Sequence, residues 1–302
     1  MTVAVIGTGL AGLACARMLA EGGEKVVLLD KSKGYGGRMA SRRRGDFAFD
    51  HGLPAFDPIP AETIPALADL PEWGAYGRVG TPRMNAFPRE IGEGFESRMG
   101  ARIMAIDART LDLTDEERAR HGGFSRVVVA IPAPQAAALL HGHGDAFAPA
   151  GAATYEPGIT LMLGGGAGDA AGAQRMTPQS GPLASIIRDD LKPGRMAGSP
   201  CHVAHACTDW AAANLERDPD AIARDLCIAF AALTGLDPTD AAYCTAHRWR
   251  YCHVARGVEA PFLISADGRI GACGDWCGAD RGGGDARAAW RSGEAAGRAM
   301  LG

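Results

Sequence analysis

The residues best suited to chemistry lie near the start of the chain, in a glycine-rich turn that follows a short apolar segment. Three glycines there have the spacing G-x-G-x-x-G: Gly7, Gly9 and Gly12. Residues 3–6 are expected to form a buried strand, and the turn leads into a helix that reaches about Glu21. In such a turn the first glycine makes the bend, the second lets a pyrophosphate approach the backbone, and the third lets the helix pack on the strand. The unpaired N–H groups of the first helical turn, at Leu10 and Ala11, then attract the phosphate charge.

An acidic residue stands where a ribose would need it. Asp30 follows a second apolar segment, Val26–Leu29, and lies 18 residues after Gly12. A carboxylate at this position accepts a hydrogen bond from a ribose hydroxyl. A glycine turn alone is weak evidence, but its combination with a second strand and an acid is specific. Because an acid at this strand end disfavours a 2′-phosphate, the sequence predicts a site for FAD or NAD and not for NADP.

A second glycine pair follows soon after this acid. Gly36 and Gly37 would permit another close approach of backbone to nucleotide, and the guanidinium of Arg38 could bind a phosphate oxygen. Lys31 stands at the same strand end and is a further candidate for cofactor contact. The alternative is a flexible loop with a solvated basic run, because Arg42–Arg44 follow at once.

Two segments, Asp30–Ser32 and Gly36–Met39, carry a resemblance to a known family. They resemble the flavin-binding signature of the FAD-dependent amine-oxidase-like family and are most similar to its renalase branch. The resemblance covers nearly the whole chain and is strongest at residues 3–52 and 243–301. It is weak through 53–82, which is shorter than the cap region of renalase-like proteins, so a more open substrate pocket is expected. The resemblance implies FAD that is bound noncovalently.

The resemblance assigns further cofactor contacts in the first half of the chain. Residues 46–52 alternate like a strand that ends in a glycine turn, and Asp50 and Gly52 match an Asp-x-Gly that lies against the flavin in this family. An ordinary turn is the alternative. The backbone near Ile103, in a strand predicted over 101–106, would contact the adenine.

The end of the chain is also expected to return to the cofactor. Gly274 and Asp275 match the second flavin motif of the family, in which Asp275 would accept hydrogen bonds from the ribityl chain or lie near the pyrophosphate. A last helix over 286–301 would point its positive N-terminus at the flavin pyrimidine carbonyl and stabilise charge that develops there on reduction. The residues at that N-terminus are Ala286 and Arg287, which follow the predicted N-cap Asp285.

A strand predicted over 242–250 and the residue after it supply the candidate substrate residues. His247, Trp249 and Tyr251 would share one face, and the two intervening arginines the other. An aromatic face opposite the flavin could enclose a planar ring, and an arginine such as Arg250 could hold a phosphate or a carboxylate. The alternative is a core stripe of aromatic side chains with solvated arginines. The Trp-Arg-Tyr sequence is also similar to the renalase branch.

Length and charge limit the classes of protein that fit. The 302 residues exceed one ordinary domain and suit two. A formal net charge of -4 gives no global positive field, so neither nucleic acid nor an anionic membrane is an expected partner. The basic cluster over 31–44 is the exception, and it could attract an anionic substrate. The apolar run Val127–Leu140 is interrupted by Pro132 and Pro134 and is too short to span a bilayer, so a cytoplasmic protein is expected.

The cysteines and histidines do not predict a metal site. Eight cysteines are scattered through the chain, and without a recognisable secretory segment this favours reduced thiols. Four possible ligands stand close together: Cys201, His202, His205 and Cys207. In a strand, His202 would point away from the other three, so the four could not converge on one ion without distortion.

The elements expected around these residues give an α/β protein with two domains. A Rossmann-like, doubly wound FAD-binding domain is predicted from residues 1–55, 80–150 and 251–302. A substrate domain with a separate antiparallel sheet is predicted from residues 56–79 and 151–250. Other expected elements are a short helix within 61–70, a helix over 88–100, a polar turn at 120–123, and helices over 209–215 and 219–233, the last with Asp218 as its N-cap.

The resemblance also implies a reaction. It is the oxidation of misreduced dihydronicotinamide isomers, 2- or 6-dihydroNAD(P), to NAD(P)+, with the electrons passed to molecular oxygen to give hydrogen peroxide. No Ser-His-Asp or Cys-His arrangement is evident, so the sequence names no catalytic acid or base. The alternatives are an amine oxidase, desaturase or dehydrogenase of another small molecule, and a flavin-binding protein without turnover.

Overall fold

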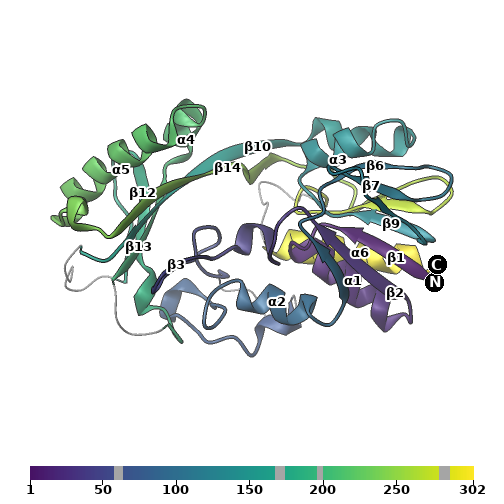
Figure 1. Ribbon diagram of the computed structural model, residues 1–302, viewed down its shortest axis with the longest axis horizontal. Helices are drawn as coiled ribbons and strands as arrows, with labels where there is room; N and C mark the ends of the chain where they lie inside the picture. Colours follow the sequence, from purple (N-terminus) through teal and green to yellow (C-terminus); the bar gives the residue numbers. More distant parts are fainter. Residues whose placement is uncertain (58–63, 167–173, 196–199, 279–285) are drawn as a thin grey trace.

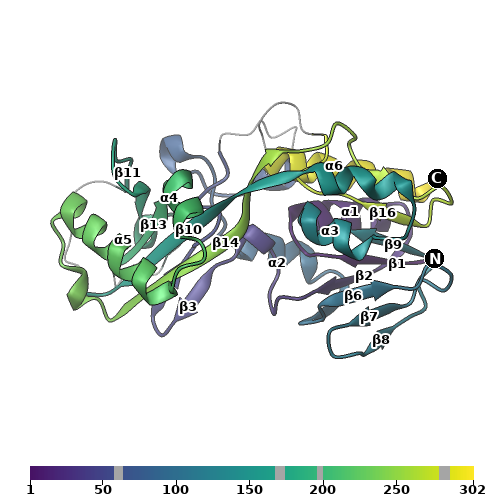
Figure 2. The ribbon, with the colours of Figure 1, turned by 90° about the horizontal axis from the view of Figure 1, so that it is seen from above.

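Two lobes make up the protein, and the chain termini lie together in one of them (Figure 1). The computed structural model describes residues 1–57, 64–166, 174–195, 200–278 and 286–302. The lobe with the termini is built on a parallel sheet, and the other lobe on an antiparallel sheet. Strands β10 (Thr154–Gly164) and β14 (Tyr243–Arg256) pair with each other and run from one lobe to the other (Figures 1 and 2). The predicted fold class is confirmed.

The parallel sheet has β1 (Thr2–Ile6) near its centre, in the strand order β15-β16-β9-β1-β2-β5. Its other strands are β2 (Lys25–Asp30), β5 (Glu96–Met99), β9 (Arg126–Val129), β15 (Leu263–Ile264) and β16 (Ile270–Ala272). Strand β15 is antiparallel to β16, and the other pairings are parallel. The chain adds β2 on one side of β1 and β9 on the other, so the direction of winding reverses at β1. Open α/β sheets bind ligands at the carboxyl ends of the strands beside such a reversal.

The two faces of the parallel sheet are covered by different layers. Helices α1 (Leu10–Glu21) and α6 (Ala286–Leu301) pack together on one face. A Cβ at Gly293 of α6 would lie 2.1 Å from the carbonyl oxygen of Ala11, so the two helix backbones approach closely only because glycine stands there. The other face packs against α3 and a small antiparallel sheet. These elements are α3 (Ala133–Leu139), β6 (Ile103–Ile106), β7 (Leu113–Asp115) and β8 (Arg120–His121).

The second lobe is an antiparallel sheet with helices on one face. Its strand order is β11-β12-β13-β10-β14. The strands not yet given are β11 (Arg175–Met176), β12 (Leu183–Arg188) and β13 (Cys201–Ala206). Helices α4 (Thr208–Asn214) and α5 (Pro219–Thr234) cover the face to which Ile159, Leu161 and Leu163 of β10 point (Figure 2).

The opposite face of this sheet meets a hairpin that belongs to the N-terminal part of the chain. The hairpin consists of β3 (Arg42–Arg44) and β4 (Phe47–Phe49). Phe49 packs there with Met162 and Val203, so the side chains of β10 alternate between the two faces of the sheet. The candidate substrate strand β14 is an edge strand, and its inner face is turned toward the N-terminal segments.

The remaining described elements are short. They are α2 (Ala86–Gly92) and the 3-10 helices η1 (Gly37–Met39), η2 (Pro65–Leu67), η3 (Gly74–Tyr76), η4 (Asp145–Ala152), η5 (Asp189–Leu191) and η6 (Pro238–Asp240). None of the helices in the described ranges has the length and apolar character needed to cross a membrane.

Two local predictions are wrong. The helix expected over 88–100 ends at Gly92, and Glu96–Met99 instead forms β5 beside β2. Gly92 lies against Tyr35, where a Cβ would come within 2.4 Å of the ring, and Gly94 follows it, so helix propensity gives way to tertiary packing. The turn expected at 120–123 begins with β8, which pairs with β7.

Other local predictions are confirmed or fall partly outside the described ranges. The helices expected near 209 and 219 are α4 and α5, and the Asp218 carboxylate caps α5 by accepting from the backbone N–H groups of Asp220 and Ala221. Of the helix expected within 61–70, only the part from residue 64 is described, and it contains η2. The predicted N-cap Asp285 lies outside the described residues. The proposed domain boundaries stay a prediction.

Candidate functional site

The first glycine motif forms an open backbone cradle at the carboxyl end of β1. Gly7 has φ +107°, and a Cβ there would lie 2.3 Å from the carbonyl oxygen of Ala130. A Cβ at Gly12 would lie 2.0 Å from the carbonyl oxygen of Gly7. Gly9 differs, because no atom lies within 4 Å of the position its Cβ would take. The first and third glycines are therefore required by packing, and the second faces free space at the start of α1, beside Leu10 and Ala11.

The second glycine pair lies against the first. Gly36 has φ +112°, and its N–H donates to the carbonyl oxygen of Thr8 at 2.9 Å. A Cβ at Gly37 would lie 3.5 Å from the Cα of Gly9. The two segments predicted to approach a nucleotide thus form one continuous backbone surface, which fits a pyrophosphate.

Asp30 is held at the mouth of this cradle. Its Oδ2 accepts from the backbone N–H and the hydroxyl of Thr8, both at 2.7 Å, and its Oδ1 accepts from the backbone N–H of Ser32 at 2.8 Å. An ionised carboxylate has room for about four hydrogen bonds, so one site is left for a ribose hydroxyl. The sequence did not predict the contribution of Thr8. Lys31 is exposed, and its ammonium donates to Gln135 at 3.3 Å.

An ion pair joins the two ends of the chain at this site. Arg38 Nη1 lies 2.6 Å from Asp275 Oδ2 and also donates to the carbonyl oxygen of Cys252 at 3.0 Å. Burial opposes the charge of Arg38, but the Asp275 carboxylate outweighs it and raises the pKa of Arg38 above its usual value. The hydroxyl of Tyr155 also lies 3.5 Å from Asp275. The guanidinium has five N–H donors, so those beyond Nη1 can still serve a phosphate oxygen.

The other predicted cofactor residues of the second half lie close by, with less definite contacts. Gly274 follows β16, and its N–H donates to the hydroxyl of Ser292 in α6 at 3.1 Å. Ala286 and Arg287 begin the described part of α6. Ile103 is buried at the start of β6, between the small sheet and the parallel sheet. Their contacts with a cofactor stay predictions.

Asp50 does not have the environment expected of a residue facing a flavin. It is 1% exposed, and its Oδ2 pairs with Arg195 and lies 3.2 Å from the ammonium of Lys192. Its backbone N–H donates to Asp189 at 2.7 Å, and Asp189 pairs with the same lysine. Burial disfavours the charged form of Asp50, but Lys192 and Arg195 outweigh it and hold the pKa of Asp50 below its usual value. This carboxylate anchors a buried ion cluster, and the flavin contact of Asp50 stays a prediction.

The lysine and arginine of this cluster were not predicted from the sequence. The side chain of Lys192 is fully buried, and that of Arg195 is 5% exposed. The only signal in the sequence is a charged run over 188–195 after an apolar strand. No spacing rule tells which carboxylate, 140 residues away, such cations would meet.

The predicted aromatic face of β14 is present, and it has an unpredicted partner. The rings of His51 and Trp249 are stacked with centroids 5.1 Å apart, and His247 meets both edge-on. The indole N–H of Trp249 donates to the carbonyl oxygen of His51 at 3.1 Å. A Cβ at Gly52 would lie 3.3 Å from Trp249 and 1.9 Å from the carbonyl oxygen of Arg38. This cluster therefore lies directly beside the second glycine motif.

The two remaining predicted substrate residues, Tyr251 and Arg250, lie in different surroundings. Tyr251 contacts Tyr155, the neighbour of Asp275, with ring centroids 5.5 Å apart. Arg250 projects from the opposite face of β14 and pairs with Glu216 at 2.5 Å, in the solvent. Alternation along the strand places Arg250 on the face opposite His247, as expected, and its role toward a substrate stays a prediction.

Two histidines of this cluster are held neutral at physiological pH. Burial, followed by the neighbouring His247 and Arg42, lowers the pKa of His51 to about 4. Burial, followed by Arg42, also lowers the pKa of His247 to about 4. Nδ1 of His51 is buried and has no hydrogen-bond partner within the described ranges. Burial therefore keeps this imidazole in its neutral form and out of contact with solvent.

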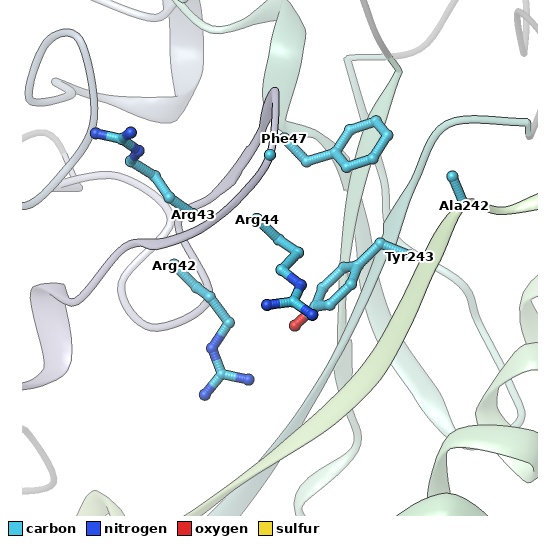
Figure 3. A pocket seen from close by; sticks show the side chains of 7 residues that line it. Arg42, Arg43, Arg44, Phe47, Ala242 and Tyr243 are labelled. Carbon is cyan, nitrogen blue, oxygen red and sulfur yellow. The ribbon is translucent and has the colours of Figure 1, made fainter.

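A basic hollow of about 770 Å³ opens beside the histidines (Figure 3). It is lined by Arg42, Arg43, Arg44, Gly45, Phe47, Ala242 and Tyr243. Figure 3 shows the side chains of Arg42 and Arg44 on the same side of β3 as the ring of Tyr243. Arg42 donates to Nδ1 of His247 at 3.4 Å, so the hollow and the aromatic cluster adjoin.

The possible metal ligands of β13 point apart. The ring of His202 contacts Phe230 of α5 on one face of the sheet, with centroids 5.2 Å apart. His205 lies on the other face, with Nδ1 3.3 Å from the hydroxyl of Thr160. In the part of the chain that the structure describes, no group of three His, Cys, Asp or Glu residues is arranged to hold a metal ion.

Comparison with known proteins supports the dinucleotide-binding fold. Residues 5–69 match the family of NAD(P)-binding Rossmann-like domains. The chain is 42% identical over 52 residues to a 4,4'-diapophytoene desaturase (4,4'-diaponeurosporene-forming) of Staphylococcus haemolyticus (strain JCSC1435). This match covers 17% of the chain and 10% of the desaturase, so the chain matches about a tenth of the length of these curated relatives.

Solved structures match over the whole chain at low sequence identity. A candidate protoporphyrinogen oxidase from Exiguobacterium sp. 255-15 superposes with a TM-score of 0.69 and 11% identity, over 99% of this chain and 98% of the other. Wild-type putrescine oxidase bound to putrescine superposes with a TM-score of 0.62 and 11% identity, over 99% and 98%. The chain therefore has the fold of these oxidases.

We expect Gly9→Val to abolish retention of FAD without unfolding the protein. The added side chain points into free space in the structure, so packing is not disturbed, but it fills the position that a pyrophosphate would approach. The measurement is the ratio of flavin to protein after purification and acid release, together with the thermal unfolding curve. Gly34→Val is the matched control, because a Cβ there also meets nothing within 4 Å. Full flavin occupancy in Gly9→Val would contradict the assignment.

We expect the protein to lose stability as the pH falls from about 6.5 to about 4, in part through His51. The pKa of this side chain is lowered on folding, so the unfolded state binds the proton first and is favoured in this range. A shift of this size corresponds to roughly 3 kcal/mol when fully expressed. His51→Gln should flatten the dependence of the unfolding free energy on pH, measured by urea denaturation. An unchanged slope would show that His51 is not buried in its neutral form.

Proposed function

We propose that the chain binds FAD noncovalently and is a renalase-like oxidase. In this proposal it oxidises 2- or 6-dihydroNAD(P) isomers to NAD(P)+, with molecular oxygen as acceptor and hydrogen peroxide as product. One observation supports the binding of FAD. Both glycine segments and the ion pair of Arg38 and Asp275 lie together at the carboxyl end of β1. Two remote parts of the chain thus converge where this fold binds a dinucleotide.

FAD, when bound, supplies the redox chemistry by accepting a hydride. The side chains of the protein would bind and orient the cofactor and the substrate. Arg38 offers its remaining N–H groups to phosphate oxygens, and Asp30 keeps one acceptor site for a ribose. The ring of Trp249, which stacks on His51 on one side, would provide a planar surface for a nicotinamide.

The basic hollow supports an anionic substrate. Arg43 and Arg44 are exposed, and no carboxylate lies within ion-pair distance of either within the described ranges. The phosphates of a dinucleotide would complement these guanidinium groups, with Phe47 and Tyr243 available to an aromatic base. A cationic amine would be repelled at the same place, which disfavours the amine-oxidase alternative. A desaturase or dehydrogenase of another anionic molecule remains the second candidate.

The direct test is anaerobic mixing of the yellow holoprotein with 6-dihydroNAD. We expect rapid loss of the visible flavin absorbance, and recovery with formation of hydrogen peroxide when oxygen is admitted. A flavin that stays yellow with the 2- and 6-isomers but bleaches with another anionic donor would support the second candidate. A flavin that stays yellow with every donor would indicate a flavin-binding protein without turnover.

We expect Arg44→Gln to raise KM for the dihydronicotinamide substrate about two- to fivefold, with little change in kcat. The expected size is that of an exposed ion pair of at most about 1 kcal/mol. The KM of the wild type should also rise with ionic strength, because salt screens such a contact. Arg298→Gln is the control, since this exposed arginine lies on α6 and pairs with Glu294. Equal KM values in all three proteins would exclude the hollow as the anion site.

A further inference from the structure

Two cysteines from different elements lie side by side on the antiparallel lobe. Cys227 belongs to α5 and Cys244 to β14, and their sulfur atoms are 3.4 Å apart. Cys244 is exposed and Cys227 is half-buried. Neither has a place in the proposed cofactor or substrate site, because α5 covers the face of the sheet turned away from that site (Figure 2).

The two thiols form a hydrogen-bonded pair in which one sulfur favours the thiolate. The contact with the Cys227 sulfur lowers the pKa of Cys244, against burial and the carboxylate of Asp220. The same contact with Cys244, together with burial, raises the pKa of Cys227. A thiolate is the nucleophilic form of cysteine, and an accessible thiolate beside a second thiol is the arrangement that peroxides oxidise reversibly.

The other cysteines provide the contrast. Four of them are buried: Cys15, Cys201, Cys273 and Cys277. Cys207 and Cys252 are half-buried, like Cys227, but neither contacts a second thiol within the described ranges, and the Cys207 thiol donates to the carbonyl oxygen of Gly181 at 3.3 Å. Accessibility to solvent and contact with a second thiol therefore come together at the pair of Cys227 and Cys244.

We propose that Cys227 and Cys244 are a peroxide-sensitive dithiol that closes to a disulfide between α5 and β14. The Cys244 thiolate attacks one oxygen of a peroxide and forms an S–O bond, while the O–O bond breaks and the leaving oxygen takes up a proton. The Cys227 sulfur then attacks the sulfenic sulfur, forms the S–S bond and releases the second oxygen as water. Two thiols lose two protons and two electrons, and hydrogen peroxide is reduced to two molecules of water.

The geometry requires little movement for this closure. The sulfur atoms must approach from 3.4 Å to a bond length of about 2 Å, which a small side-chain rotation can supply. The new bond would link the second half of α5 to the start of β14. Because the bond constrains the unfolded chain, we expect the oxidised protein to unfold at a higher temperature than the reduced one.

The test is peroxide treatment of the reduced holoprotein, followed by alkylation with N-ethylmaleimide and mass spectrometry of non-reduced peptides. We expect one dominant product, a peptide pair that links Cys227 to Cys244 and lacks two hydrogen atoms, while Cys207 remains alkylated. The midpoint of thermal unfolding should rise and should return to its first value after reduction. The oxidase proposed above would release the same oxidant, but the peroxide is added here, so the result does not depend on turnover.

Two variants keep the outcome decisive. In Cys227→Ser the sulfenic acid of Cys244 should persist and react with dimedone, because no second thiol resolves it. In Cys207→Ser, the matched control, the linked peptide pair should form as in the wild type. Alkylation of both Cys227 and Cys244 after peroxide has oxidised other residues would overturn the proposal. So would oxidation of Cys244 in the wild type without the link.

Discussion

The ion pair between Arg38 and Asp275 is the contact on which the rest of the site depends. Asp275 is almost fully buried, and a buried carboxylate is tolerated only with a charged or hydrogen-bonding partner. Its partner follows directly on the glycine pair that lies against the first glycine motif. One contact therefore fixes the position of three segments: the turn after β1, the turn after β2 and the turn after β16. Loss of the Arg38 charge would leave the Asp275 carboxylate buried without its charged partner, which is more damaging than loss of both charges.

A second set of buried charges determines where the histidines lie. Asp50 is fixed by Lys192 and Arg195 from the loop after β12, and the next residue along the chain is His51. The stack of His51 on Trp249 is therefore held from both sides, by a strand of the antiparallel sheet and by an ion cluster next to it. The same arrangement excludes water from the imidazole, and this exclusion is what keeps it neutral. The burial of His51 thus both fixes the position of its ring and keeps the ring neutral.

The sequence predicted the parts of the protein that local patterns determine. The strand, glycine turn and helix at the N-terminus, the acid at Asp30, and α5 with its N-cap all follow from rules that span fewer than about twenty residues. The aromatic alternation of β14 was also predictable, because a strand repeats every two residues. Contacts between distant segments could not be predicted. For this reason Lys192, Arg195 and His51 were missed, and the ion pairs of Asp50 were not foreseen. The helix expected over 88–100 failed likewise, since pairing with β2 overrides the preference of a short segment.

The two strands that cross between the lobes have an irregularity at their midpoint. The register of β10 against β14 shifts between Glu156 and Gly158, and a Cβ at Gly158 would lie 2.5 Å from the sulfur of Cys252. A bulge sharpens the local twist and bends the ribbon, and the missing side chain lets the partner strand come close at that point. The carbonyl oxygen of the same Cys252 accepts from Arg38. The bend between the lobes and the hydrogen bond of Arg38 thus meet at a single residue of β14.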